Sequence, residues 1–148
     1  MLNKFMTIAL EEAKEVKKDI PVAALIVKDN KIISLATNKR EENNQTIAHA
    51  EILALNEANK KLNSWRLDDC EIYVTLEPCP MCAWAILNAR IKNIYFGSWD
   101  LKYGAFGSAI DLSKLANSKI NIKGGILESE CNDLIKNYFE NLRNEKET

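Results

Sequence analysis

The chain has 148 residues, of which 47% are hydrophobic and 28% are charged, a composition typical of one folded domain with a sizeable core. The charges of its 20 basic and 21 acidic residues nearly cancel, which excludes a strongly cationic protein that coats nucleic acid. The longest apolar run, Ile20 to Val27, is broken by Pro21 and is much shorter than the roughly 20 residues of a membrane helix. The N-terminus lacks a signal-peptide pattern, so the sequence predicts a cytoplasmic protein without a membrane segment.

Hydrophobic periodicity and turn residues divide the chain into helices and strands. In chain order, the predicted elements are a helix that starts at Leu2 and ends near residues 19–21, a hairpin of strands Val22–Val27 and Ile32–Ala36, a helix Ala48–Leu62, a strand Glu71–Leu76, a helix Pro78–Arg90, a strand Lys92–Phe96, a short helix Asp111–Ala116, a short strand Lys119–Ile122 and a helix Leu127–Leu142. Residues 38–45 and the glycine-rich segment 97–108 are predicted to be loops, and residues 144–148 to fray. This order predicts one α/β domain over residues 1–148, built on a single mixed sheet.

Two short segments combine residue types that bind metals. The first is HAE at residues 49–51, at the start of a predicted helix, and it contains the only histidine of the chain. The second is PCPMC at residues 78–82, where a predicted strand meets a helix. A C-x-x-C at a helix start places both sulfurs on one face, and the positive end of the helix favours the thiolates that a metal requires.

Together, His49, Cys79 and Cys82 offer one nitrogen and two sulfurs, and leave the fourth position of a tetrahedral zinc ion open to water. Such an open site is the arrangement of catalytic zinc, which lowers the pKa of its water. Glu51 lies two residues from the histidine and is predicted to carry protons between water, base and leaving amine rather than to bind the metal. H-x-E followed by P-C-x-x-C is the established signature of zinc-dependent base deaminases.

Beyond this signature, the sequence resembles the bacterial tRNA-specific adenosine deaminases over nearly its whole length. The matching segments are PV (21–22), TIAHAE (46–51), VTLEPCPMCA (74–83), NARI (88–91) and FGSWDLKYGAFGS (96–108). The resemblance implies a cytidine-deaminase-like fold, which is a three-layer α/β/α sandwich around a five-stranded mixed sheet, and usually a homodimer. It implies hydrolytic conversion of adenosine to inosine at the wobble position of a tRNA anticodon stem-loop, with one zinc ion per subunit. Carried over by position, the three ligands and the proton carrier named above keep those roles.

The resemblance also implies three substrate contacts. Asn38 matches the asparagine of the family that contacts the flipped base, and Asp100 and Lys102 match a loop that touches the flanking ribose and phosphate. Taken alone, each residue has a plainer interpretation, with Asn38 as a turn residue, Asp100 as a turn cap and Lys102 as a solvated charge.

The chain departs from the family at several places. Trp84 and Phe106 stand where smaller residues are usual, and are expected to change packing near the site, the dimer contact or the substrate rim. Trp65, Trp84 and Trp99 are predicted to be core or interface residues rather than platforms for base stacking. Residues 126–148 include six acidic and three basic residues, which disfavours binding of RNA phosphates by the last helix.

Two other functions remain open. A deaminase of a free nucleobase or nucleoside, of the guanine or cytosine type, would share the zinc signature. The acidic C-terminus and the extra aromatic residues favour it, whereas the loop at residues 97–108 favours tRNA. Salt dependence distinguishes the two, because RNA binding weakens steeply with ionic strength. A non-catalytic zinc-binding or RNA-binding subunit could dispense with the carboxylate, so the presence of Glu51 disfavours it.

Overall fold

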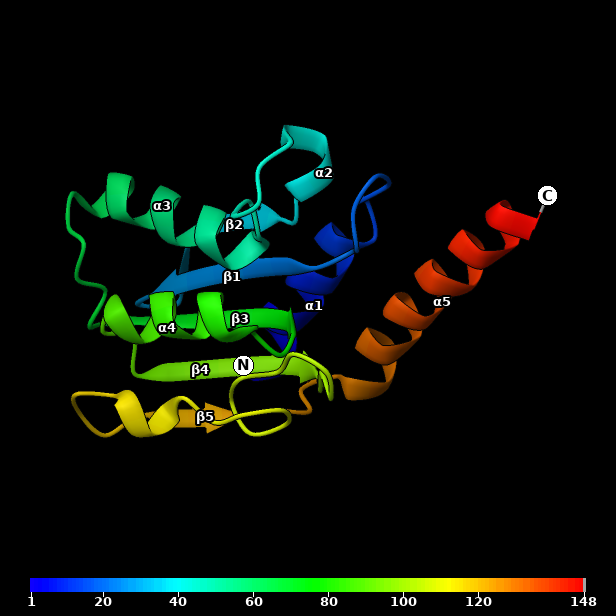
Figure 1. Cartoon of the computed structure of the whole chain (residues 1–148). Coiled ribbons are helices and arrows are strands. Elements are labelled where there is room, and N and C mark those ends of the chain that lie inside the picture. The colour runs from blue at the N-terminus through cyan, green and yellow to red at the C-terminus, as the bar shows by residue number, and fades with distance from the viewer. Residues whose placement is uncertain (148) are drawn as a thin grey trace.

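The computed structural model describes residues 1–147 and shows one sheet with helices on both of its faces (Figure 1). The helices are α1 (Leu2–Ala13), α2 (Arg40–Asn43), α3 (Ala50–Leu62), α4 (Pro80–Asn88) and α5 (Glu128–Glu147), with a 3-10 helix at Ser113–Leu115. The strands are β1 (Ala23–Lys28), β2 (Lys31–Thr37), β3 (Cys70–Leu76), β4 (Asn93–Ser98) and β5 (Asn121–Lys123). Within residues 1–147, no helix combines the length and the apolar character that a membrane span requires.

The five strands form a mixed sheet in the order β2-β1-β3-β4-β5. β1 pairs antiparallel with β2 and β3, whereas β3, β4 and β5 are parallel. Asp29 and Asn30 connect β1 to β2 with left-handed backbones (φ 51° and 60°), the conformation that a tight two-residue hairpin requires. Helix α4 provides the crossover that the parallel pair of β3 and β4 needs. The mixed five-stranded sheet expected from the sequence is therefore confirmed.

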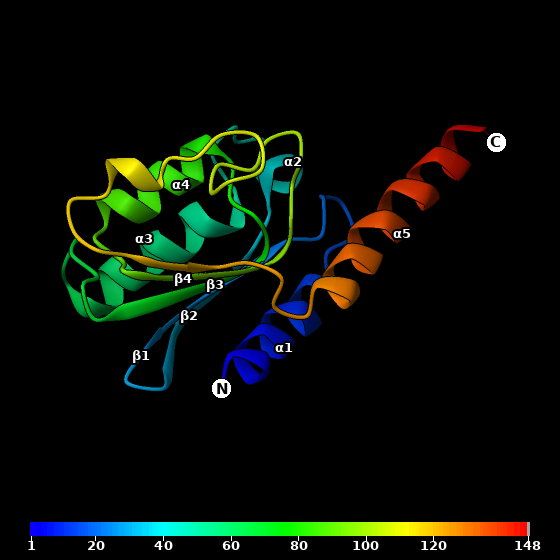
Figure 2. The same ribbon diagram turned by 90° about the horizontal axis from the view of Figure 1, so that it is seen from below.

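Helices α3 and α4 cover one face of this sheet, and α1 and the start of α5 cover the other (Figure 2). In β1, Ala24 and Ile26 belong to the core beneath α3 and α4, while Leu25 and Val27 belong to the core beneath α1. Strands that are buried on both faces are continuously apolar, which explains the uninterrupted run in the sequence of β1. The expected α/β/α sandwich is confirmed, with one core on each side of the sheet.

Two helix boundaries differ from the sequence prediction. Helix α1 ends at Ala13, and tighter hydrogen bonds from the N–H groups of Glu15 and Val16 to carbonyls three residues earlier complete its last turn. The prediction that Pro78 begins a helix was wrong. Pro80 takes the first helical position of α4, where the absence of a backbone N–H costs nothing.

Other differences concern segments predicted as loops or ends. The polar segment at residues 38–45 contains the single turn α2, which ends at Asn44 in the left-handed conformation (φ 52°). The short helix expected at residues 111–116 is a three-residue 3-10 turn. Residues 144–147 continue α5 instead of fraying, and the remaining residue of that prediction, Thr148, lies outside the described residues.

Candidate active site

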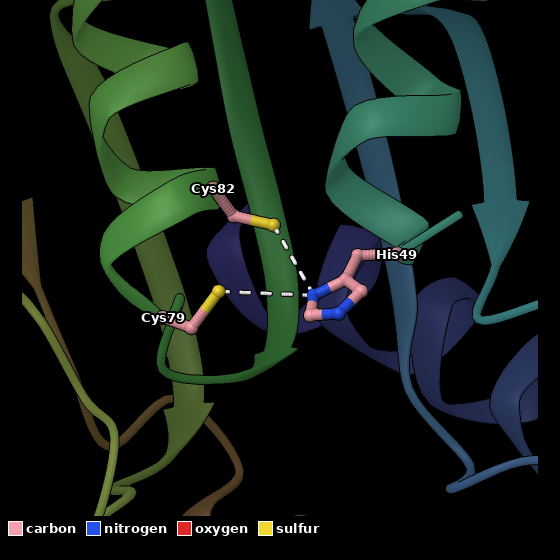
Figure 3. A group of neighbouring side chains, drawn as sticks. All are labelled: His49, Cys79 and Cys82. Carbon is pink, nitrogen blue, oxygen red and sulfur yellow. Dashed lines mark hydrogen bonds between the residues drawn. The ribbon is translucent and has the colours of Figure 1, made fainter. Parts of the chain in front are cut away.

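Three side chains that bind metals meet where the first residues of α3 and α4 approach each other (Figure 3). His49 directly precedes α3, Cys79 directly precedes α4, and Cys82 lies in the first turn of α4. The Nδ1 atom of His49 lies 3.7 Å from the Sγ atom of Cys79 and 3.5 Å from that of Cys82. One nitrogen and two sulfurs within 4.8 Å of one another can hold a single metal ion.

Local sequence rules place both cysteines at the helix start. The residue before a proline is kept out of the helical region, so Cys79 adopts an extended backbone (φ −73°, ψ 172°) just before Pro80. Cys82 follows three residues later, one turn along the same helix face. The partial positive charge at the start of α4 stabilises negative sulfur at both positions.

The electrostatics of the cluster prepare one sulfur for metal binding. A hydrogen bond from Cys82, and a further one from His49, lower the pKa of the Cys79 thiol to about 4. The hydrogen bond to Cys79, together with burial, raises the pKa of Cys82. Hydrogen bonding to Cys79 also raises the pKa of His49. Cys79 is therefore a thiolate at neutral pH, which is the form of cysteine that coordinates metals.

Glu51 lies next to this cluster, in the first turn of α3, with only 5% of its surface exposed. Burial raises the pKa of its carboxyl to about 7, and a hydrogen bond from Cys82 partly offsets this effect. In the described part of the chain, the group that can hold a metal consists of the histidine and two cysteines, without Glu51. A carboxyl group with a raised pKa, outside the group that could hold a metal, can exchange protons near neutral pH.

Three residues of this group, His49, Glu51 and Cys79, line a pocket of about 400 Å³, within the usual size range of small-molecule sites. Its wall includes His49, Glu51 and Cys79 together with residues from two loops. The segment after β2 supplies Asn38 and Arg40, and the loop after β4 supplies Asp100 and Tyr103. The apolar residues of the wall are Ile20, Val22, Ala50 and Leu76. The pocket therefore joins a metal-binding group, a buried carboxylate and hydrogen-bonding side chains in one cavity.

Comparison with known proteins agrees with this geometry. The family model described as MafB19-like deaminase matches residues 2–143. The chain is 40% identical over 146 residues to the tRNA-specific adenosine deaminase of Bacillus subtilis, covering 96% of this chain and 91% of that protein. The chain belongs to the tRNA-specific adenosine deaminase family. The resemblance expected from the sequence motifs is thereby confirmed.

Two solved structures are similar to this deaminase in both sequence and fold. One comes from a study of A-to-I editing by tRNA:A34 deaminases at the wobble position; it has a TM-score of 0.81 and 35% identity, covering 88% of this chain and 98% of that chain. The other is a guanine deaminase from Bacillus subtilis, with a TM-score of 0.62 and 31% identity over 78% of this chain and 96% of that chain. The fold is shared by both, so the choice between their substrates depends on the pocket and its rim.

The structure brings most of the predicted site residues of the deaminase together. Asn38 and Asp100 line the pocket, and they also have the local roles that their sequence suggested. Asn38 Oδ1 accepts the N–H of Arg40 (3.2 Å), and Asp100 Oδ1 accepts the N–H groups of Lys102 (3.1 Å) and Tyr103 (3.0 Å). Of the predicted residues in the described chain, the buried Cys82 and the exposed Lys102 are not in the pocket wall. The ammonium nitrogen of Lys102 lies 5.1 Å from the ring centre of Tyr103, on the exposed rim.

Three pocket residues of the deaminase escaped the sequence analysis. Tyr103 and Glu77 lie within segments that were singled out for other residues, and Arg40 lies in a stretch that was predicted only as a polar loop. The buried carboxylate of Asp19 holds α2, and thus Arg40, beside the pocket by accepting the N–H groups of Glu41 (2.7 Å) and Glu42 (3.2 Å). A positive charge and an aromatic ring therefore flank the entrance.

The unusual aromatic residues of the deaminase lie elsewhere. Trp65, Trp84 and Trp99 are 58%, 45% and 43% exposed, which excludes core positions and leaves the interface positions that the prediction also allowed. Trp99 packs edge-on against Phe96 at 4.7 Å between ring centres. Phe106 is 6% exposed and belongs to the core beneath α3 and α4, so it changes packing under the loop rather than the substrate rim.

Proposed function

We propose that residues 1–148 form a single zinc-dependent deaminase domain that converts adenosine to inosine at the wobble position of a tRNA anticodon. The main support for this proposal is a pocket lined by His49, Cys79 and the buried Glu51, with Cys82 within reach of the same metal position. Membership of the tRNA-specific adenosine deaminase family supports the choice of substrate. A cytoplasmic location fits both a tRNA substrate and the four free cysteines.

The donor atoms of this site suit zinc, with one ion per subunit. One imidazole and two cysteines are ligands that zinc prefers, and a set of three leaves one position open for catalysis. A bound zinc ion would activate water as a nucleophile near neutral pH. The Cys79 thiolate supplies negative charge for the cation. The start of α4 stabilises that thiolate and fixes the orientation of the two sulfurs.

Glu51 is the residue that moves protons in this proposal. Its carboxylate accepts a proton from the attacking water, whose oxygen forms the new bond to C6 of adenine, and gives that proton to the purine ring nitrogen. Glu51 then takes the proton of the new C6 hydroxyl and passes it to the amine. The C6–N bond breaks, so that water and adenosine yield inosine and ammonia. Its burial keeps bulk water away from these transfers.

The loops around the pocket suit a base taken out of a single strand. An anticodon loop is single-stranded, so its wobble base enters a pocket at modest unstacking cost. The Asn38 amide can hydrogen-bond to a base edge. Asp100 and Lys102 meet the flanking ribose and phosphate. At the entrance, Arg40 offers a positive charge and Tyr103 offers a ring for stacking. The base is thereby read by hydrogen bonding, while the backbone positions the RNA.

A free-nucleobase deaminase is the second candidate. The acidic residues of the last segment, six against three basic residues after position 125, favour it, because they repel RNA phosphates. The likeness to a guanine deaminase structure is consistent with such a substrate. Arg40 and Lys102 at the entrance, which a neutral base does not need, favour RNA.

A direct comparison of substrates tests the function. The zinc-loaded protein is expected to form inosine in an anticodon stem-loop with adenine at the wobble position, and to release no ammonia from guanine or cytosine. Because the phosphate contacts are ionic, kcat/KM for the stem-loop should fall on the order of tenfold between about 50 and 200 mM salt. Ammonia from a free base alone, at a rate unaffected by salt, would assign the protein to nucleobase deamination.

We also propose that the protein is a homodimer that associates through α3 and α4. The outer surfaces of these helices carry the exposed Trp84 and a shallow groove of about 180 Å³, whose wall includes Ile52 and Trp65. Exposed tryptophans of this kind are enriched in protein interfaces. Sedimentation of the wild type should give twice the mass of one chain, and Trp84→Glu should shift it to the monomer. A wild type that sediments as a monomer at micromolar concentration contradicts the proposal.

A further inference from the structure

A second buried carboxylate lies beside the active site without any part in the chemistry proposed above. Glu77 follows the end of β3, lies two residues before Cys79 and contributes to the pocket wall. Only 2% of its surface is exposed, and no lysine or arginine in residues 1–147 forms an ion pair with it. Burying a carboxylate without a cation is costly unless several hydrogen-bond donors surround it.

The required donors all come from the loop that follows β4. Glu77 Oε1 accepts the backbone N–H of Asp100 (3.1 Å) and the hydroxyl of Ser108. Glu77 Oε2 accepts the backbone N–H groups of Phe106 (3.0 Å) and Ser108 (3.2 Å). One side chain thus binds the beginning and the end of the loop at residues 98–108. Hydrogen bonds to an ionised acceptor are roughly twice as strong as neutral ones.

The loop is folded closely around this carboxylate. A Cβ atom at Gly104 would overlap with the Glu77 carboxylate, so the backbone reaches it only because this residue is glycine. The N–H of Gly104 donates to the carbonyl of Asp100 (2.8 Å), and the N–H of Ala105 donates to the carbonyl of Pro78 (2.9 Å). The loop is therefore held against the turn that leads into Cys79.

We propose that Glu77 is a positioning residue, which holds the 98–108 loop and its pocket-lining residues Asp100 and Tyr103 at a fixed place relative to Cys79. One wall of the pocket is the turn that carries a metal-binding residue, and another is this loop. The carboxylate joins the two walls directly. The consequence for substrate binding rests on the proposed function, whereas the consequence for the loop rests on the hydrogen bonds alone.

Limited proteolysis measures the loop without reference to activity. Lys102 is exposed in the middle of the loop, and trypsin cuts after lysine only when the segment can leave its folded conformation. In Glu77→Gln, the new amide N–H₂ faces backbone N–H donors, so fewer hydrogen bonds hold the loop. Cleavage after Lys102 is expected to be about tenfold faster than in the wild type, because each lost bond to a charged acceptor shifts local opening by about that factor.

A matched control separates this effect from a general loss of stability. Ser34→Ala removes another buried side-chain hydrogen bond, from Ser34 Oγ to the carbonyl of Ala54 (2.8 Å), far from the loop in the sequence. Its cleavage after Lys102 should remain within about twofold of the wild type. Ser108→Ala removes one donor and keeps the carboxylate, so it should show a smaller increase if Glu77→Gln fails to fold.

Stem-loop kinetics then distinguish positioning from a purely structural role. A displaced wall weakens substrate binding, so KM for the stem-loop should rise about tenfold in Glu77→Gln. A lower folded fraction would instead reduce kcat and leave KM unchanged. Unchanged cleavage after Lys102, or faster cleavage with unchanged KM, would overturn the proposal. A wild type that does not deaminate the stem-loop would refute the proposed function, and the KM comparison would then be made with the free base that it does deaminate.

Discussion

Replacing Glu51 with Gln is expected to lower kcat for stem-loop deamination by about 10³-fold, because a positioned proton carrier contributes on the order of 10²–10⁴-fold. The amide has nearly the same shape and size, but it neither accepts the proton of the attacking water nor delivers one to the leaving amine. The side chain lies outside the group of metal-binding residues. Zinc should therefore remain at one ion per subunit in Glu51→Gln.

Single-turnover kinetics and atomic absorption test both halves of this prediction. Glu57→Gln is the matched control, since Glu57 is in the same helix α3 but has a side chain that is 42% exposed and pairs with Lys61 at 3.0 Å. A surface ion pair contributes little to the free energy of unfolding, so its loss should leave kcat within about twofold of the wild type. If Glu51→Gln keeps more than about a tenth of the activity, another group carries the protons.

The proximity of the three candidate metal-binding residues could be predicted from the sequence because their signals are local. Cys79 and Cys82 share one helix turn, and a proline between them marks where that helix begins. His49 directly precedes the other helix, and Glu51 follows within its first turn. The sheet could be predicted for a similar reason, since a strand covered on both faces is apolar throughout.

The rest of the pocket depends on contacts between distant parts of the chain. Glu77 meets Asp100 and Ser108 across 23 and 31 residues, and no local pattern in the sequence records such a pairing. Arg40 reaches the pocket because the buried Asp19 fixes α2 from a separate segment. Hydrophobicity alone could not decide between core and interface positions for the tryptophans, because large aromatic side chains occur in both.

Replacing Cys79, a proposed metal ligand, is expected to cause the second large loss of activity. In Cys79→Ser, the thiolate is replaced by a hydroxyl that stays protonated near neutral pH. Zinc content and activity should both fall by more than about 100-fold, because loss of a residue that only supports a ligand already lowers metal affinity or activity by about 10–100-fold. Cys79 is the sulfur that its neighbours keep ionised, so its loss removes the preformed negative charge of the site. The expected zinc content is close to zero after dialysis against a weak chelator.

Cys70→Ser provides the matched control for the same chemical change. Cys70 is buried at the start of β3, at the opposite end of the strand from the metal-binding turn. It should lose some stability, because a hydroxyl is costlier to bury than a thiol, but it should retain one zinc ion and near-normal kcat. This contrast separates ligand loss from damage to the core. Full zinc occupancy in Cys79→Ser would mean that the metal is held by other residues, and the assignment of His49 and Cys82 would fall with it.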